Sequence, residues 1–213
     1  MADIEKAPEL YTTLEGYGTD EFEEKKSIFI GHAAPAKTEE EAMAFIKSKQ
    51  KEFSDATHNV WAYYMKGGIS ARYSDDGEPQ GSSGMPVLDT IRKSGVNDAV
   101  VVVTRYFGGT LLGVGGLVRA YSHAAKIALE AARIITYEKY SEIYFECNYA
   151  DYQKLNAELP HYGAIIDSSD FSDKVAVSFA VKKSLGDGLI TRFRELTGGR
   201  CIPEIMGERF DYR

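Results

Sequence analysis

The first 135 residues alternate between short segments rich in β-branched and aromatic residues and longer segments with helical spacing. Residues 10–18 and 25–34 predict the two strands of a hairpin, with a turn-like acidic stretch between them. Thr38 followed by Glu41 is a capping box, so we expect a helix to begin there and to run to about residue 52. This pattern favours a sheet on which a helix packs.

A second hairpin follows. Residues 60–66 and 69–74 predict two strands joined by a pair of glycines, and the polar segment after them leads to a short helix that runs through Ser94. Residues 99–106 (AVVVVTRY) form a nearly continuous apolar run. Such a run is typical of a strand that is buried on both faces.

The pattern changes after Ile135. It predicts strands at 137–148, 163–168, 173–182 and 200–206, and helices at 150–161 and 186–198. This βαββαβ order is that of a ferredoxin-like domain. We therefore predict an α+β protein of two domains, residues 1–135 and 136–213, with the boundary near Thr136 and a frayed tail over residues 207–213.

Composition narrows the class of protein. The chain has 213 residues, 44% of them hydrophobic, and it contains no apolar run of the length that a membrane span needs. Its start, MADIEKAPEL, lacks the pattern of a signal peptide, and Cys147 and Cys201 stand apart from any metal-binding spacing. We expect a cytoplasmic protein with free thiols, no membrane partner, no cofactor and no metal. Because the net charge is −7, we expect any anionic partner to bind a local cluster of cations and not the protein surface as a whole.

The glycine-rich residues 108–116 (GGTLLGVGG) lead into a helix predicted over about 117–134. Free N–H groups at a helix start, together with the helix dipole, favour an anion such as a phosphate. No acidic residue lies between Asp98 and Glu130, whereas three cations and the aromatic residues Tyr106, Phe107 and Tyr121 do. A nucleotide or an RNA backbone would fit this surface, although glycines can also serve only a tight turn and helix packing. The predicted anion-binding residues are Arg105, Tyr106, Gly108, Gly109, Gly113, Gly115, Gly116, Arg119 and Lys126.

The polar segment DDGEPQGSSG, residues 75–84, is a second candidate. Its carboxylates could bind a hard cation, but they could equally cap turns, and we favour capping. The two serines could cap the following helix, and they lack the setting of a serine nucleophile. His58 could be a general base, yet a hydrogen-bonding histidine before a strand is more common. This possible supporting loop comprises His58, Asp75, Asp76, Gly77, Glu78, Gly81, Ser82 and Ser83.

Four segments together carry a family resemblance: KKSIFIGHAAP, DATHNVWAY, RYSDDGEPQGSSGMPVLDTI and VVVVTRYFGGTLLGVGGLVRAY. They closely resemble the IMPACT family in its bacterial two-domain form. The resemblance implies a first domain like the second domain of a small-subunit ribosomal protein, and a second domain similar to elongation-factor modules. It also implies a link to translation control without an established catalytic activity. The resemblance places the family's signature surface on two loops of this chain. One is residues 75–81, which includes Pro79, and the other runs from Arg105 to Arg119.

Three hypotheses follow. The first is a non-enzymatic protein that binds RNA, the ribosome or a translation-machinery protein through the loop from Arg105 to Arg119, with no DNA sequence specificity. The second is an enzyme that holds a phosphorylated small molecule or nucleotide, with Mg²⁺ bound by the carboxylates of residues 75–78. The third is a protein-interaction module that uses an aromatic sheet face around Trp61 and Tyr63.

Overall fold

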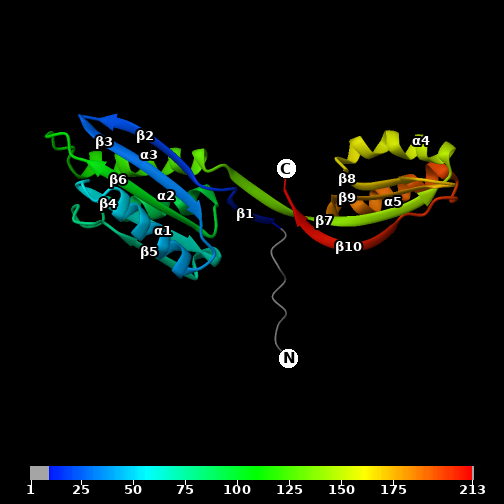
Figure 1. Cartoon of the computed structure of the whole chain (residues 1–213), viewed down its shortest axis with the longest axis horizontal. Helices are drawn as coiled ribbons and strands as arrows, with labels where there is room; N and C mark the ends of the chain where they lie inside the picture. Colours follow the sequence, from blue (N-terminus) through cyan, green and yellow to red (C-terminus); the bar gives the residue numbers. More distant parts are fainter. Residues whose placement is uncertain (1–9, 213) are drawn as a thin grey trace, which may run out of the picture. The chain divides into compact units, whose positions relative to one another are not determined.

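The computed structural model describes residues 10–212, apart from the side chain of Lys66. The expectation about a signal peptide concerns residues that lie almost wholly outside this range. The described chain divides into two compact units: a first unit of residues 11–136, and a second that contains Leu10 and the residues from Tyr137 onward (Figure 1). Within the described part, no helix is both long enough and apolar enough to cross a membrane.

The first unit is built on a five-stranded antiparallel sheet with the strand order β2-β3-β6-β4-β5. Its elements in chain order are β1 (Leu10–Leu14), β2 (Gly18–Glu24), β3 (Ser27–Pro35), α1 (Glu39–Glu52), β4 (His58–Met65), the short 3-10 turn η1 (Lys66–Gly68), β5 (Ser70–Ser74), α2 (Gly84–Ser94), β6 (Ala99–Tyr106) and α3 (Val114–Ala131).

Helices cover both faces of this sheet. On one face α1 packs on alternate residues of β4 and β6, with Ile46, Tyr63 and Val102 in the core between them. On the other face α2 and α3 pack side by side on the remaining residues of the same strands. The central strand β6 is therefore buried on both sides, as its apolar run predicts.

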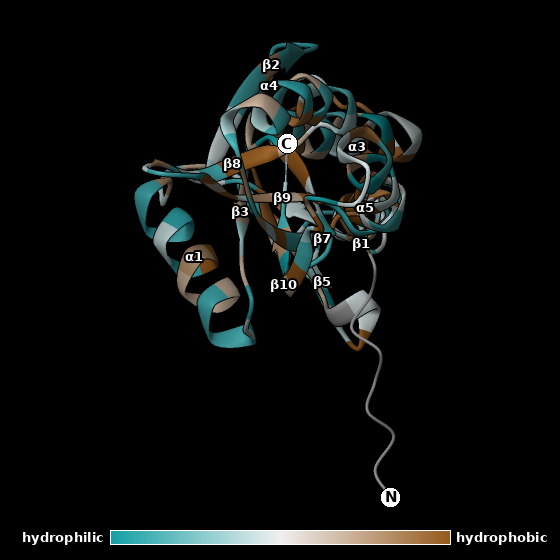
Figure 2. Ribbon diagram, turned by 90° about the vertical axis from the view of Figure 1, so that its right-hand side faces the viewer, coloured by the Kyte–Doolittle hydropathy of each residue, from teal (hydrophilic) through white to brown (hydrophobic). Residues whose placement is uncertain are grey.

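The start of the chain differs from the prediction. Residues 10–18 do not form one strand, and the acidic stretch after them is not a turn but β2, which pairs with β3. β2 is the edge strand, so its carboxylates reach solvent while Phe22 points toward α3, and Figure 2 shows the strand as mostly hydrophilic. An edge strand with one buried position lacks the apolar alternation on which the prediction depended.

The second unit has the element order βαββαβ. β7 (Ile134–Cys147), which begins in the first unit and also pairs with β1, is followed by α4 (Tyr149–Glu158), the 3-10 turn η2 (Leu159–Tyr162), β8 (Ile165–Phe171), β9 (Val175–Lys182), α5 (Lys183–Thr197) and β10 (Glu204–Asp211). The strands lie in the order β10-β7-β9-β8, and every neighbouring pair is antiparallel. Residues of α4 and α5, including Leu155, Leu189 and Phe193, form a core with alternate residues of the strands.

The end of the chain also corrects a prediction. Residues 207–211, expected within a frayed tail, belong to β10 and pair with β7 from Glu204 to Asp211. Half-buried and exposed residues alternate over this segment, as in an edge strand with one face toward the unit. Arg213 lies outside the described residues.

Candidate functional site at the glycine-rich loop

The glycine-rich loop connects the end of β6 to the start of α3. Gly113 is the N-cap of α3 with φ of 72°, and the helix begins at Val114, three residues earlier than predicted. No side chain caps the helix and its first turn contains no acidic residue. Leu111 and Val114 are exposed by 82% and 62%. The loop thus presents free helix N–H groups with apolar side chains around them.

The five glycines of the loop differ in their structural roles. A Cβ on Gly108 would lie 2.0 Å from the backbone carbonyl of Lys26, so this glycine lets the loop pack on the turn between β2 and β3. Gly109 and Gly113 have positive φ, which favours glycine. Gly116 packs against Leu112, whereas a Cβ on Gly115 would meet nothing. Packing and turn geometry therefore account for part of a pattern that the sequence associates with an anion.

Arg105 is not a surface residue. Its side chain is 5% exposed, and its Nη1 donates a hydrogen bond to the equally buried carboxylate of Glu78. Nη2 donates to the Ser27 hydroxyl at 3.3 Å, and the guanidinium lies over the ring of Phe29. This geometry does not favour the predicted contact between Arg105 and a ligand anion, because the charge of Arg105 is neutralised by Glu78 inside the first unit.

Glu78 brings together groups from several elements. Besides Arg105, it accepts a hydrogen bond from the hydroxyl of Tyr121 on α3 at 2.9 Å, and His58 Nε2 lies 3.8 Å away. Burial, and then the nearby Glu78 carboxylate, raise the pKa of Tyr121 well above its ordinary value, so this hydroxyl stays a donor. His58 Nδ1 lies 2.7 Å from the carbonyl oxygen of Asp76, which fits the structural role that we favoured.

The carboxylates in the loop of residues 75–84 accept hydrogen bonds from groups of the first unit. Asp75 accepts hydrogen bonds from the backbone N–H groups of Gly81, Ser83 and Gly84 and from the Ser83 hydroxyl, and so caps the start of α2. Asp76 accepts from the backbone N–H of Asn59 at 2.6 Å. Across the described residues, no three His, Cys, Asp or Glu side chains come together as a metal site.

The capping role of Asp75 predicts a pH dependence of stability. Burial alone would raise the pKa of the Asp75 carboxyl, but the hydrogen bonds from Gly81, Ser83 and Gly84 outweigh it and hold the pKa below its ordinary value. A depressed folded-state pKa stabilises the protein above the unfolded pKa of about 3.9 and ceases to do so as the pH falls through the folded value. We expect Asp75→Asn to lower the free energy of unfolding at pH 7 by about 1–2 kcal/mol.

Urea unfolding of both proteins at pH 7 and near pH 3 measures this effect. The difference between wild type and Asp75→Asn should shrink on acidification, because the wild-type carboxyl then becomes neutral as well. An equal difference at both pH values would contradict the capping role.

Other sequence-predicted residues are placed as follows. The Tyr106 hydroxyl donates to Asp55 at 2.9 Å, and Lys126 is exposed on α3 with its ammonium 3.7 Å from Glu130. Ser82 is buried and donates to the carbonyl of Pro79. Trp61 and Tyr63 stack on each other beneath α1, where Tyr63 is fully buried and Trp61 is partly buried, so α1 covers much of the sheet face around them.

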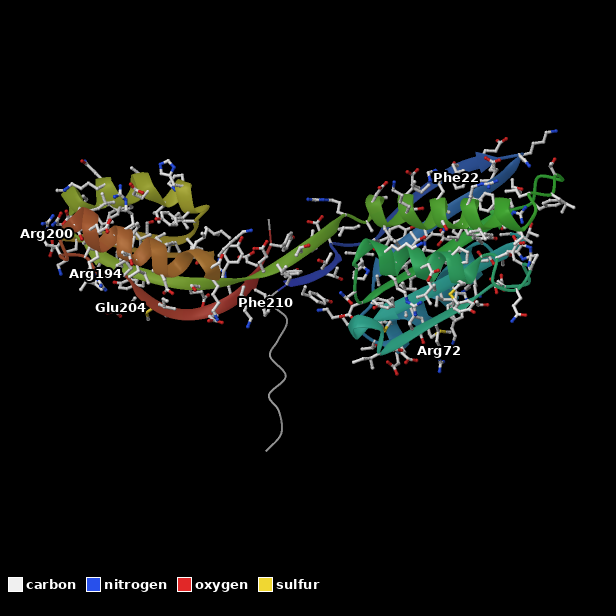
Figure 3. All side chains as sticks on the ribbon, turned by 180° about the vertical axis from the view of Figure 1, so that it is seen from behind. Phe22, Arg72, Arg194, Arg200, Glu204 and Phe210 are labelled. Carbon is white, nitrogen blue, oxygen red and sulfur yellow. The ribbon has the colours of Figure 1, made fainter. Side chains whose placement is uncertain are left out.

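A basic hollow lies beside the glycine-rich loop. Its volume is about 250 Å³, and it is lined by Lys25, Arg119 and His123 together with Phe22, Glu24, Leu112, Gly116 and Ala120. Within residues 10–212, neither Lys25 nor Arg119 makes an ion pair, and both are exposed. Figure 3 shows Phe22 on β2 next to α3, where its ring contacts that of His123 at 4.6 Å between centroids.

Of the residues that line this hollow, the sequence-based prediction included Gly116 and Arg119 but not Lys25, His123 or Phe22. Lys25 stands outside the acid-free window and was assigned to a strand, although it and Lys26 form the turn between β2 and β3 with φ of 48° and 66°. The KK pair was the available signal, since only the fold shows that this turn lies against the loop that contains Gly108.

Comparison with known proteins connects this geometry to a family. Residues 25–129 match the family model described as the Impact N-terminal domain. IMPACT family member YvyE of Bacillus subtilis is 32% identical over 89% of this chain and 88% of its own length. The chain belongs to the IMPACT family. The matched N-terminal domain contains the loop, the Arg105–Glu78 pair and most of the residues that line the hollow.

The IMPACT relationship extends to the second unit. Residues 145–200 match a domain of unknown function, DUF1949, as in a two-domain bacterial member. IMPACT family member YigZ of Escherichia coli is 35% identical over 74% of this chain and 78% of its own length. A solved structure described as a hypothetical protein is similar to 94% of this chain and 99% of its own, with a TM-score of 0.59 and 29% identity.

Proposed function

We propose that this IMPACT-family chain is a non-enzymatic, cytoplasmic regulator of translation that binds RNA of the translation machinery. In this proposal the phosphate backbone of the RNA binds in the hollow between the turn of Lys25 and the start of α3, and it does not contact Arg105. Within this proposal the strand order β10-β7-β9-β8 supports a ferredoxin-like second domain. The link to translation comes from the family, which has no established catalytic activity.

The observation that carries the proposal is a pair of exposed, unneutralised cations beside an uncapped helix start. Lys25 and Arg119 line the same hollow and have no ion pair in the described part of the chain. The first turn of α3 offers N–H groups and the positive end of the helix dipole at Gly116. Phosphate oxygens are bound by this combination of charge and backbone donors.

The turn between β2 and β3 supports the same conclusion. Lys25 and Lys26 both have positive φ, a conformation that favours glycine, asparagine or aspartate in a two-residue hairpin turn. Two lysines there cost conformational energy. If these lysines bind RNA, their charge explains why they occupy a turn in which glycine, asparagine or aspartate would be more stable.

The geometry favours binding over the Mg²⁺-dependent enzyme. The carboxylates expected to hold the metal are Asp75, Asp76 and Glu78, and their oxygens already accept hydrogen bonds from the backbone, from Ser83, from Tyr121 and from Arg105. A cation bound there would have to displace the cap of α2 and the partner of a buried guanidinium.

Sedimentation with ribosomes and with bulk RNA across a salt series tests the proposal. We expect salt-sensitive binding by the wild type. In Lys25→Asn/Arg119→Ala, affinity should fall about tenfold, and the slope of log affinity against log salt should decrease by roughly two, because two phosphate contacts are lost. Asparagine suits the positive φ at residue 25, so this variant keeps its stability.

Lys47→Ala/Lys51→Ala is the matched control. It removes two exposed cations from α1, on the opposite face of the sheet, and should bind RNA like the wild type. Equal losses in the two variants would show that binding is a general charge effect. Absence of wild-type binding to both ribosomes and RNA would refute the proposed function.

A further inference from the structure

Among residues 10–212, no helix covers one of the two sheet faces of the second unit. Register places Ile143, Phe145 and Val177 on the side of α4 and α5, where they are buried. The alternate residues, such as Glu142 and Tyr144, therefore point to the opposite side and are only half-buried. We call this opposite side the open face.

The open face has more carboxylates than cations. Arg209 on β10 forms ion pairs with three carboxylates at once, those of Asp167 on β8, Asp211 and Glu142. Two of these negative charges are therefore not balanced by it. The lysines on the face, Lys174 and Lys182, are each occupied by one glutamate of β7.

Two further carboxylates on this face are unpaired. Asp170 is opposite Ala176 in the β8–β9 register, and Glu204 is opposite Tyr144 in the β10–β7 register, so both belong to the open face. Both are exposed, and neither makes an ion pair with another described residue. Figure 3 shows Glu204 on β10, on the side of the unit away from α4.

A hollow lies between these charges. It has a volume of about 340 Å³ and is lined by Tyr144, Ser178 and Met206 together with Glu142, Ile143, Asp167 and Phe179. Met206 is 67% exposed, an unusual state for a thioether side chain. Methionine adapts its shape to apolar groups and is common at surfaces that bind protein segments.

We propose that the open face binds a lysine- or arginine-rich segment of a protein partner. Cations of the segment contact the unbalanced carboxylates around Arg209 and at Asp170 and Glu204, while one of its apolar side chains enters the hollow beside Tyr144 and Met206. Charge complementarity selects this partner, since the same carboxylates repel an RNA backbone. The second unit therefore engages protein, and this inference is independent of RNA binding by the first unit.

Fluorescence anisotropy with the full chain tests the inference. The probe is a labelled 12-residue peptide of alternating lysine and leucine, and a copy with glutamate in place of lysine serves as the reversed-charge probe. We expect the wild type to bind the lysine peptide and not the glutamate peptide. Asp170→Asn/Glu204→Gln should weaken the binding of the lysine peptide about fivefold, with a smaller salt dependence.

Two further variants make the result specific. Glu21→Gln/Glu23→Gln removes two exposed carboxylates from β2 in the first unit, so it changes net charge equally and should bind like the wild type. Met206→Ala keeps every charge and should weaken binding about threefold through loss of the apolar contact. Equal effects of the two carboxylate variants, no effect of Met206→Ala, or binding of RNA that is lost with Asp170 and Glu204 would each overturn the inference.

Discussion

Glu78→Ala is expected to lower the free energy of unfolding by about 3–5 kcal/mol, because it leaves the guanidinium of Arg105 buried without its counter-charge. Both side chains are only 5% exposed, so water cannot replace the lost carboxylate without opening the first unit. The Tyr121 hydroxyl loses its acceptor in the same variant. Urea unfolding followed by circular dichroism measures the change.

The exposed pair Lys126–Glu130 on α3 provides the control. Its side chains are 67% and 59% exposed, and Glu130→Ala should change stability by less than about 0.5 kcal/mol. Glu78→Ala combined with Arg105→Met should cost less than the sum of the two single variants, since the double variant leaves no unpaired charge. Equal costs for Glu78→Ala and Glu130→Ala would show that the buried pair is unimportant.

Gly108→Ala is expected to destabilise the protein by at least about 2 kcal/mol, because its Cβ would lie 2.0 Å from the carbonyl carbon and oxygen of Lys26. These are backbone atoms of the turn between β2 and β3, so relief requires the turn or the loop to move. Thermal or urea unfolding detects the loss. Gly108 therefore links the glycine-rich loop to the turn that contains Lys25.

Gly115→Ala is the matched substitution in the same loop-to-helix segment. A Cβ there meets no atom within 4 Å, and the residue lies in the first turn of α3. Alanine is the better helix former, so we expect stability to stay the same or to rise by up to about 1 kcal/mol. If both substitutions destabilised equally, the glycines would act through backbone freedom alone and not through the close approach at Gly108.

The sequence predicts most elements because their apolar periodicity is strong. β6 and α1 fall where the pattern places them, since a doubly buried strand and a capped helix leave clear signals. β2 and the end of β10 were not predicted, because edge strands bury few side chains and so lack a clear apolar alternation. The hydrogen-bond partner of β10, which is β7, is also distant in sequence.

The candidate site was less predictable than the fold. The sequence predicts Arg105 and Arg119 equally as anion-binding residues, because both lie in a window without acidic residues. The partner of Arg105 is Glu78, which lies 27 residues earlier and outside that window. Charge counted along a chain cannot detect neutralisation across a fold, and for the same reason it cannot bring Lys25 to the loop.

The interactions around Arg105 also constrain when the site can form. Ser27 is separated by 78 residues from Arg105 and by 81 from Gly108, to which it is hydrogen-bonded, and Glu78 is 43 residues from Tyr121. Contacts of this range close large loops, and closing them costs entropy that slows folding. During synthesis the turn of Lys25 leaves the ribosome long before α3 does, and the nascent chain cannot present the basic hollow until α3 has emerged.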